Sequence, residues 1–535
     1  MSKPPIAAAL AYHELTKHRL PNRYAKSLGF MDWDTQPTPF RRYEGCELEP
    51  LARSFDAERG PTLDEVYDPS RVATQPVNAN SVARLLFDSM ALSAWKQLGE
   101  NRWALRCNPS SGNLHPTEAY VVGAIPGLSE APAVWHYAPL VHALERRAAL
   151  EPKLWDTLRG DGDGVIIGLS SIPWRESWKY GERAFRYCQH DVGHAIAALA
   201  LSAGALGWHL RALPSIDDAG AARLLGLPEP SGPEPEHPDL VLFVGPRPPG
   251  HAPTLSDSLT LDLVGTPNVL SESHHPWPSI NGVAHACTRS GPVVIDEPSP
   301  TATPEPSPTG ASAHHVFRTR RSAVEMDGVT GLSREAWLRM LARTLARPGH
   351  APFASLLGRP RVHLLLFVHR VDGVEPGLYL LLRDPSVRAT IAENMHTDFD
   401  WAPVDTGPLA LPLWRLELAD ARPVAALVSC RQAIAADGAF AVAMLAELGP
   451  ALAEHGAWMY RHLHWEAGAI GQVLYLEAEA AGRRATGIGC FFDDGVHELI
   501  GVADDSLHTI YHFTVGGAVE DPRIATVDAY HHLEP

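Results

Sequence analysis

An internal repeat constrains the fold of this chain more than any other feature of its sequence. Phe185-Arg186 recurs as Tyr460-Arg461, Gly193 recurs as Gly468, and the LLGL segment at 224–227 recurs as LIGV at 499–502. Each pair is separated by the same 275 residues, so the two segments align without a gap from residue 185 to residue 227. The repeat predicts two copies of one structural unit, and a length of 535 residues suits two or three domains.

The repeat and the local composition divide the chain into four segments. Residues 296–312 (DEPSPTATPEPSPTGAS) are dominated by Pro, Ser and Thr, as expected of a stiff, extended linker. We predict a wrapping N-terminal extension over 1–80, a first repeat over 81–250, a Pro/Ser/Thr-rich linker over 251–315 and a second repeat over 316–535. The extension has no counterpart in the second half.

Both repeats alternate predicted helices with short apolar runs. Ala- and Leu-rich segments at 184–206 and 466–481 predict long helices buried on most sides, and 335–345 predicts an amphipathic helix. Apolar runs predict strands at 119–124, 165–169, 240–244, 362–368, 378–382, 424–429 and 509–515. The pattern predicts an α/β (α+β) fold in which each repeat has a mixed central sheet flanked by helices.

Composition and charge exclude several classes of protein. Hydrophobic residues make up 45% of the chain and charged residues 20%, as in folded globular proteins. A net charge of −17 argues against a nucleic-acid binder and against acidic membranes as partners. The six cysteines stand singly, and no His/Cys spacing predicts a metal site. No segment has the length of a membrane span or the pattern of a signal peptide, so we expect a cytoplasmic protein.

Three polar segments are candidates for holding a cofactor. A loop of small residues lets a flat ring approach the backbone, clustered guanidinium groups suit a phosphate, and a GxG segment leaves amides open to a ligand. Each has an ordinary alternative, namely a turn-forming loop, a solvated basic patch or a chance GxG. The candidate cofactor-binding residues are Arg106, Pro109, Ser110, Ser111, Gly112 and Asn113 in the first half, with Arg318, Arg320, Arg321, Ser322, Gly487, Ile488 and Gly489 in the second.

In this combination and order, the segments resemble the nitroreductase superfamily, and most closely its SagB-type, or thiazole/oxazole dehydrogenase, branch. CNPSSGNLHPTEAYVV at 107–122 resembles the PSxGxxHPxExYVV segment of that branch, and WKYGERAFRYCQHDVGH at 178–194 resembles its KYGxRxYRxxxxDxGH segment. The resemblance covers roughly residues 80–245 and 316–525. It implies two nitroreductase-like domains, fused in tandem and packed as an intrachain pseudo-dimer.

The resemblance also implies how a cofactor site is divided between the halves. In such proteins FMN lies across a dimer interface, with the RxS and glycine loops from one subunit and the PSxGN loop from the other. Here Ala212-Leu213-Pro214 replaces the glycines in the first half, and the second half has no Ser/Asn loop near Pro352. A single complete FMN site is therefore predicted. Val324 replaces the basic residue often found after the RxS serine, and Arg523 is a candidate substitute.

Lys179 and Tyr180 are the candidate catalytic residues, because they match the Lys-Tyr pair implicated in proton transfer in azoline-oxidising members of that branch. Glu454-His455 stands at the corresponding position of the second half. A lysine that burial keeps uncharged can act as a base, with a phenol as the partner donor. The alternative is a pair of residues at a helix end that only covers apolar surface.

The sequence thus predicts an FMN-dependent oxidoreductase that transfers hydride between flavin N5 and a small organic or peptide-borne substrate. One alternative is a nitro or quinone reductase of the same fold, with NAD(P)H as co-substrate. Another is a scaffold for a biosynthetic partner that binds no flavin. The pseudo-dimer can in principle associate further.

Overall fold

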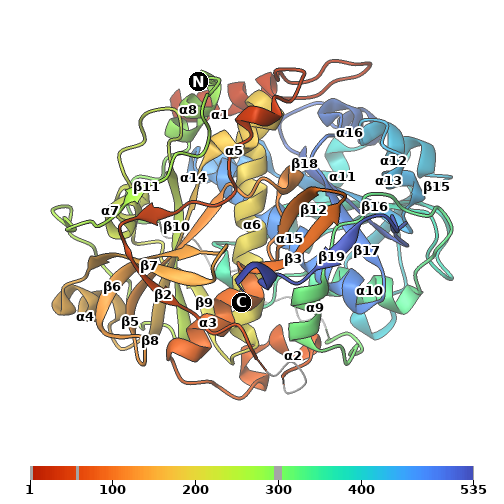
Figure 1. The fold of residues 1–535 in the computed structure, drawn as a ribbon. Coiled ribbons are helices and arrows are strands. Elements are labelled where there is room, and N and C mark those ends of the chain that lie inside the picture. The colour runs from red at the N-terminus through yellow and green to blue at the C-terminus, as the bar shows by residue number, and fades with distance from the viewer. Residues whose placement is uncertain (1–3, 56–59, 294–303, 534–535) are drawn as a thin grey trace.

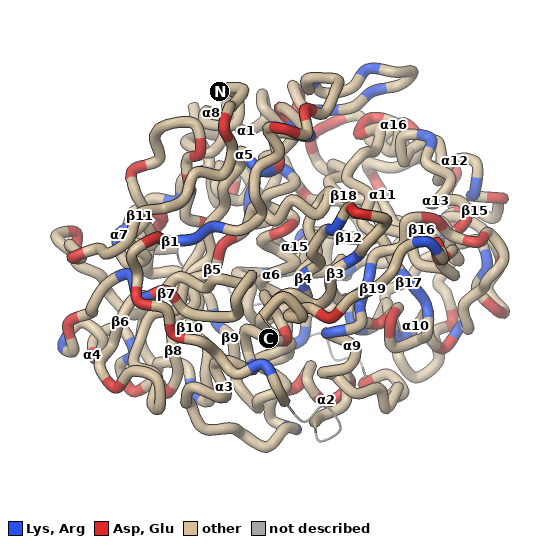
Figure 2. Tube along the Cα trace, in the orientation of Figure 1, with Lys and Arg blue, Asp and Glu red and all other residues tan. Residues whose placement is uncertain are grey.

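The two halves of the chain lie side by side on either side of one long central helix, α6 (Ala184–Gly204) (Figure 1). The computed structural model describes residues 4–55, 60–293 and 304–533, so much of the predicted linker at 296–312 lies outside the described residues. Acidic and basic residues are interspersed over both halves (Figure 2). The net charge is therefore not gathered in one region.

The first half is built on a seven-stranded sheet whose strand pairs are all antiparallel. In sheet order, its strands are β2 (Glu47–Pro50), β7 (Ala143–Ala149), β6 (Ser129–Ala138), β5 (Thr117–Ile125), β8 (Asp163–Ser171), β10 (His237–Arg247) and β9 (His209–Ala212). Its helices are α3 (Ala79–Ser89), α4 (Pro152–Arg159), α5 (Pro173–Tyr180), α6 and α7 (Asp218–Leu225). The central strands are buried along almost their whole length, as expected of a sheet covered on both faces.

The second half repeats this plan. In sheet order, its strands are β14 (Ala402–Pro403), β15 (Leu413–Leu418), β13 (Gly377–Leu381), β12 (Val362–Val368), β16 (Phe440–Ala446), β18 (His508–Gly516) and β17 (Arg484–Ile488). Its helices are α10 (Arg334–Arg343), α11 (Arg388–Asn394), α12 (Arg422–Val428), α13 (Ile434–Asp437), α14 (Leu448–His455), α15 (Met459–Ala480) and α16 (Asp493–Ile500). Two α/β domains of one topology confirm the predicted fold class, although every described strand pair in both sheets is antiparallel rather than mixed.

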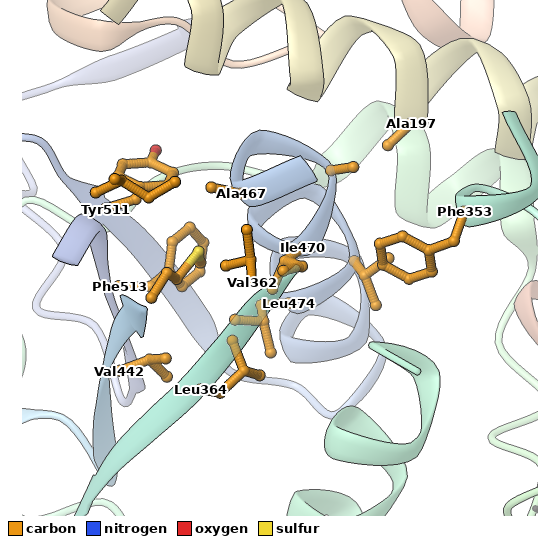
Figure 3. Close-up of a cluster of buried hydrophobic side chains, with 14 of the residues drawn as sticks. Ala197, Phe353, Val362, Leu364, Val442, Ala467, Ile470, Leu474, Tyr511 and Phe513 are labelled. Atoms are coloured by element: carbon orange, nitrogen blue, oxygen red, sulfur yellow. The ribbon is translucent and has the colours of Figure 1, made fainter. Parts of the chain in front are cut away.

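The 275-residue offset seen in the sequence is reproduced by the helices. The pairs α5 and α14, α6 and α15, and α7 and α16 each begin 275 residues apart. In the core of the second half, side chains of α15 pack on β12, where Ile470 and Leu474 approach Val362 and Leu364 (Figure 3). The repeat in the sequence is therefore a repeat of packed elements.

Helices α6 and α15 cross at two glycines that are equivalent in the repeat. A Cβ atom on Gly468 would lie 2.1 Å from the carbonyl oxygen of His190, and one on Gly193 would lie 2.2 Å from that of Trp465. His190 and Trp465 are themselves equivalent positions. The same patch on each repeat therefore contacts its counterpart, which is the signature of a two-fold interface.

Two buried ion pairs obey the same symmetry. Arg186 of the first repeat donates from Nη1 to Asp493 of the second at 2.6 Å, and Arg461 donates from Nη2 to Asp218 at 2.5 Å. Arg461 and Asp493 are the repeat equivalents of Arg186 and Asp218. Arg183, followed by Arg186, holds the pKa of the Asp493 carboxyl well below its usual range, against the effect of burial. The halves form an intrachain pseudo-dimer.

Both ends of the chain cross to the other half. In α1 (Pro4–Leu15), Tyr12 makes edge contacts with Phe185 and with its repeat equivalent Tyr460. Just after this helix, Lys17 pairs with Asp494 at 2.8 Å. At the other end, β19 (Ala525–Val527) extends a small sheet formed by β3 (Leu92–Leu98) and β4 (Asn101–Arg106). These crossings tie the two repeats together.

The described parts of segments 1–80 and 251–315 contain packed elements. Strand β1 (Tyr43–Glu44) pairs with β11 (Thr266–Pro267), and α8 (Pro278–Ala286) packs against α1. The helix α9 (Ala313–Thr319) lies against α2 (Leu63–Val66). Among the described helices, none is both long enough and apolar enough to cross a bilayer.

One predicted strand is wrong. Residues 424–428 lie in the short helix α12, Ser429 is its C-cap, and the next strand along the chain is β16. Pro423 occupies the first turn of α12, where its missing N–H costs nothing. Ala425 and Val428, three residues apart, are the buried positions of this helix. An apolar run of this length does not by itself distinguish a strand from one buried helical face.

Candidate functional site

The Ser/Asn loop of the first half lies against the Lys-Tyr pair. The loop contains a 3-10 turn at Ser111–Asn113 between β4 and β5, and Gly112 has a positive φ of 61°. A Cβ on Gly112 would lie 2.6 Å from Tyr180 Oη and 3.2 Å from Lys179 Nζ. Glycine is thus required both by the backbone conformation and by the close approach of these two side chains.

The rest of this loop is fixed by local hydrogen bonds. Asn113 Nδ2 donates to the carbonyl of Ala104 at 2.7 Å, and the His115 amide donates to Ser110 Oγ at 2.8 Å. The Ser111 amide donates to Asp191 of α6 at 3.1 Å. Pro109 is buried. These hydrogen bonds join the loop to β4 and to α6 and constrain its conformation.

The basic segment of the second half meets this loop from the other side. Arg320 donates from Nε to the carbonyl of Cys107 at 3.3 Å and from Nη2 to that of Arg106 at 3.1 Å. Arg318 donates to the carbonyl of Phe87 at 2.7 Å. The structure thus brings together segments of the two repeats that are about 200 residues apart in sequence.

The guanidinium groups of this segment form a concentration of positive charge. No carboxylate among the described residues pairs with Arg318, Arg320 or Arg321. Burial, followed by the charge of Arg320, lowers the pKa of Arg321 to about 10. The Nη1 atom of Arg320 is buried without a hydrogen-bond partner in the described structure. Such a donor set, with one unsatisfied N–H group, fits a phosphate or another anion.

The glycine segment joins the same cluster through two tyrosines. Tyr475 Oη lies 2.8 Å from Ser322 Oγ and accepts from the Gly487 amide at 3.0 Å. Tyr187 of α6 donates from its hydroxyl to the Gly489 carbonyl at 3.0 Å. Because its ring also lies 4.6 Å from that of Tyr180, contacts run without interruption from the glycine segment to the Lys-Tyr pair.

Several residues of this cluster were not predicted from the sequence. His190 stacks on Tyr511 with ring centroids 4.1 Å apart, and both of its ring nitrogens are buried without partners in the described structure. Burial lowers the pKa of His190 well below its usual value, so its ring is neutral. His194 donates to or accepts from Tyr511 at 3.2 Å. With 27 histidines in the chain, spacing alone did not single out these two.

Two of the predicted cofactor-binding side chains point away from the cluster. Arg523 pairs with Asp521, and its side chain is 76% exposed. Arg106 lies over the ring of Phe40 in the N-terminal extension and donates to the carbonyl of Pro39, so only its backbone carbonyl faces Arg320. Ile488 is buried in β17. The structure therefore gives Arg523 no role in the cluster.

The pseudo-symmetric position on the other side of the interface is closed. A cavity of about 10 Å³ remains there, lined by Ala212, Leu213, Pro214, His462 and Trp465 among others. His462 and Trp465 are the repeat equivalents of Tyr187 and His190. This volume is no larger than the space needed for one water molecule. Within the described residues, only one of the two equivalent positions retains the polar cluster.

The family model described as "Nitroreductase family" matches residues 79–245 and 375–517, more than half of the chain. The chain belongs to the nitroreductase family. Its two matched segments fall in the two repeats, and membership makes an oxidoreductase activity the expected one. A search of the curated proteins finds no match.

The first of three solved structures shares the fold of this nitroreductase-family chain over nearly its whole length, and the other two match with low TM-scores. A protein from Anabaena variabilis ATCC 29413, described as a putative nitroreductase, is 21% identical with a TM-score of 0.70, covering 96% of this chain and 99% of that one. The E. coli microcin synthetase McbBCD complex with truncated pro-MccB17 bound is 19% identical (TM-score 0.27; 46% of this chain, 83% of that one). A protein from Exiguobacterium sibiricum 255-15 in complex with FMN is 12% identical (TM-score 0.24; 41% and 92%).

Proposed function

We propose that this chain is an FMN-dependent oxidoreductase of the SagB-type branch, with one FMN site between the repeats. The observation that carries the proposal is the meeting of complementary segments: the Ser110–Asn113 loop with Lys179 from the first repeat, and Arg320, Ser322 and Gly487 from the second. The closed cavity at the equivalent position supports a single site per chain.

The residues present fit the cofactor. An FMN phosphate requires cationic donors, and Arg320 and Arg321 provide them without a competing carboxylate among the described residues. The ring system requires small residues and neutral polar groups, which Ser110, Gly112 and His190 provide. When bound, FMN supplies the hydride chemistry at N5, so no side-chain nucleophile is needed.

The roles of the remaining residues follow from their positions. Lys179 is proposed as the base that takes a proton from the substrate, and Tyr180 as the hydroxyl donor beside it. Both lie against Gly112, where a small organic or peptide-borne substrate would reach them. The motif resemblance favours this substrate class, with a ring that is dehydrogenated.

The first test is the cofactor content of the purified protein. We expect a yellow protein with a flavin absorption spectrum and one FMN per chain, because only one of the two equivalent positions retains the polar cluster among the described residues. A colourless protein that cannot be reconstituted with FMN would favour a scaffold. Rapid anaerobic bleaching of the bound flavin by NAD(P)H would favour the nitro or quinone reductase instead.

A matched pair of arginine variants tests the phosphate contact. Arg320→Ala should weaken FMN binding roughly 10- to 100-fold, because a charge-assisted hydrogen bond contributes on the order of 1.5–3 kcal/mol. Arg523→Ala removes an equal charge from an exposed position and should leave FMN affinity unchanged. Fluorescence titration of the apoprotein with FMN measures both. Equal losses in the two variants would indicate a general charge effect rather than a contact.

A further inference from the structure

A loop of the N-terminal extension exposes several large apolar side chains next to the Lys-Tyr pair. Residues 24–34, here called the aromatic arm, end in the 3-10 turn η1 (Trp33–Thr35). Phe30 is 66% exposed and Trp33 is 62% exposed, and Tyr24 and Met31 are exposed as well. One such side chain at a surface is ordinary, but a group of them in one short loop indicates a binding surface.

The arm is attached to α5 on both sides of the Lys-Tyr pair. Trp178 donates from Nε1 to the Asp32 carbonyl and to Thr35 Oγ1, both at 3.2 Å. The Glu182 amide donates to the Lys26 carbonyl at 3.0 Å. Trp178 directly precedes the pair in the sequence, and Glu182 follows it by two residues. The arm therefore lies along the outer end of the helix that carries the candidate catalytic residues.

Apolar contacts connect the arm with the Ser/Asn loop. Leu114, which directly follows that loop, shares a buried apolar cluster with Trp178, and the ring of Tyr180 packs against the same cluster. The ring of Trp33 meets that of Trp178 edge-on, with centroids 5.5 Å apart. Apolar side chains in contact thus lead from the Ser/Asn loop, past Tyr180, to the exposed ring of Trp33.

The other end of the arm contacts the second repeat. The ring of Tyr24 lies 5.9 Å from that of Phe492, and Asn22 just before the arm accepts from Arg431 at 2.5 Å. Phe492 follows Gly489 of the glycine segment by three residues. This part of the chain is drawn in red near α1 and α16 (Figure 1). The arm therefore borders the candidate site from the glycine segment to the Lys-Tyr pair.

The backbone and the charge of the arm suit an uncharged, extended partner. Within the described structure, the amides of residues 26–31 donate no hydrogen bond, so they are available to an extended peptide, as in other cases where a peptide pairs with exposed backbone. One lysine and two aspartates give residues 24–34 a net charge of −1 (1 − 2). This charge does not attract an anionic lipid surface.

We propose that the aromatic arm binds the apolar side chains that flank the reacting ring of a peptide-borne substrate. The inference rests on the proposed function for the identity of that ring. A peptide that places its ring against Gly112 and the Lys-Tyr pair has its neighbouring residues within reach of the arm, because the arm continues the same surface. Phe30 and Trp33 are then specificity-determining residues that do not touch the reacting atoms.

Calorimetric titration with two synthetic peptides tests the proposal without turnover. Each peptide carries one thiazole, which cannot be dehydrogenated further, flanked by phenylalanine in one and by serine in the other. The phenylalanine peptide should bind the wild type roughly 10- to 100-fold more tightly, the range expected for burial of one large apolar side chain. Phe30→Ser/Trp33→Ser should abolish this preference. Phe30→Ser alone, which alters no ring contact in the described structure, should reduce it.

A matched control removes the same kind of side chain elsewhere. Val329→Ser/Leu418→Ser changes two exposed apolar residues of the second repeat and should keep the wild-type preference. Kinetics with the corresponding thiazoline peptides separate binding from structure. In Phe30→Ser/Trp33→Ser, KM for the phenylalanine peptide should rise by the factor lost in affinity while kcat stays unchanged, whereas a structural role would also lower kcat.

The outcomes distinguish the arm from the proposed flavin chemistry. Equal affinities of the wild type for the two peptides would overturn the proposal, even if both thiazoline peptides reduce the flavin. A preference that depends on Phe30 and Trp33 in a protein without flavin activity would support the arm as a peptide-binding surface and leave only the ring unidentified. Binding to phosphatidylcholine vesicles, or dimerisation, that Phe30→Ser/Trp33→Ser abolishes would assign the arm to a lipid surface or to a second copy and overturn the proposal.

Discussion

Replacing Gly468 with valine is expected to destabilise the protein by about 3 kcal/mol, the upper end of the usual cost of overpacking. The Cβ atom would lie 2.1 Å from the His190 carbonyl oxygen and 2.9 Å from the Gly193 Cα, and backbone atoms of a buried helix cannot move aside as a flexible side chain can. The crossing of α6 and α15 would have to open. Chemical denaturation measures the loss, and the FMN site proposed at this interface should weaken with it.

Gly282 supplies the matched control. It lies in the middle of α8, and nothing lies within 4 Å of a Cβ built on it. Gly282→Ala should be neutral or slightly stabilising, because alanine has the higher helix propensity, and Gly468→Ala should already destabilise. Similar stabilities for Gly468→Ala and Gly282→Ala would show that the two helices do not cross as closely as described.

Replacing Lys179 with alanine is expected to slow turnover roughly 10²- to 10⁴-fold while leaving FMN bound, the range typical for loss of a general acid–base group. Its amine lies against Gly112 and beside the ring of Tyr180, 5.2 Å from the ring centroid. The expected signature is a normal flavin spectrum with slow anaerobic reduction by a thiazoline peptide. Stopped-flow absorbance measures that rate directly.

Lys153→Ala is the control for Lys179→Ala, because Lys153 is an exposed lysine on α4. It should behave as the wild type in both spectrum and rate. An undiminished rate of FMN reduction in Lys179→Ala would show that Lys179 is not the catalytic base. Loss of FMN from that variant would instead assign it a binding role.

Two secondary-structure predictions differ from the structure, because tertiary packing decided the conformation where the local sequence pattern indicated another. The apolar run at 424–429 has the composition of a strand, but it packs as one face of α12. The second long helix begins at Met459 rather than at the predicted residue 466. Its first turns contain His462, His464 and Trp465, which are buried at the interface between repeats. These polar residues are buried by the other repeat. They do not produce the apolar pattern of an amphipathic helix, so the sequence did not mark the first turns of α15 as helical.

Many elements and their order follow from the sequence alone. The constant 275-residue offset already fixed two copies of one topology, and the structure keeps it in α5, α6 and α7 and their equivalents. The unequal retention of the Ser/Asn loop and the glycines also led to the single site that we propose. Such features are local or repeated, so they can be recognised in the sequence without knowledge of the tertiary contacts.

Only the tertiary structure decided which residues meet. Arg186 and Arg461 are visible in the sequence as a repeated arginine, yet nothing in it says that each pairs with an aspartate of the opposite repeat. The same holds for the carboxyl groups of Glu176 and Asp191, which two different helices bring to one loop. Burial, like-charge repulsion and backbone approach at the two glycines depend on distances between remote segments, and a linear pattern of residue types does not contain those distances.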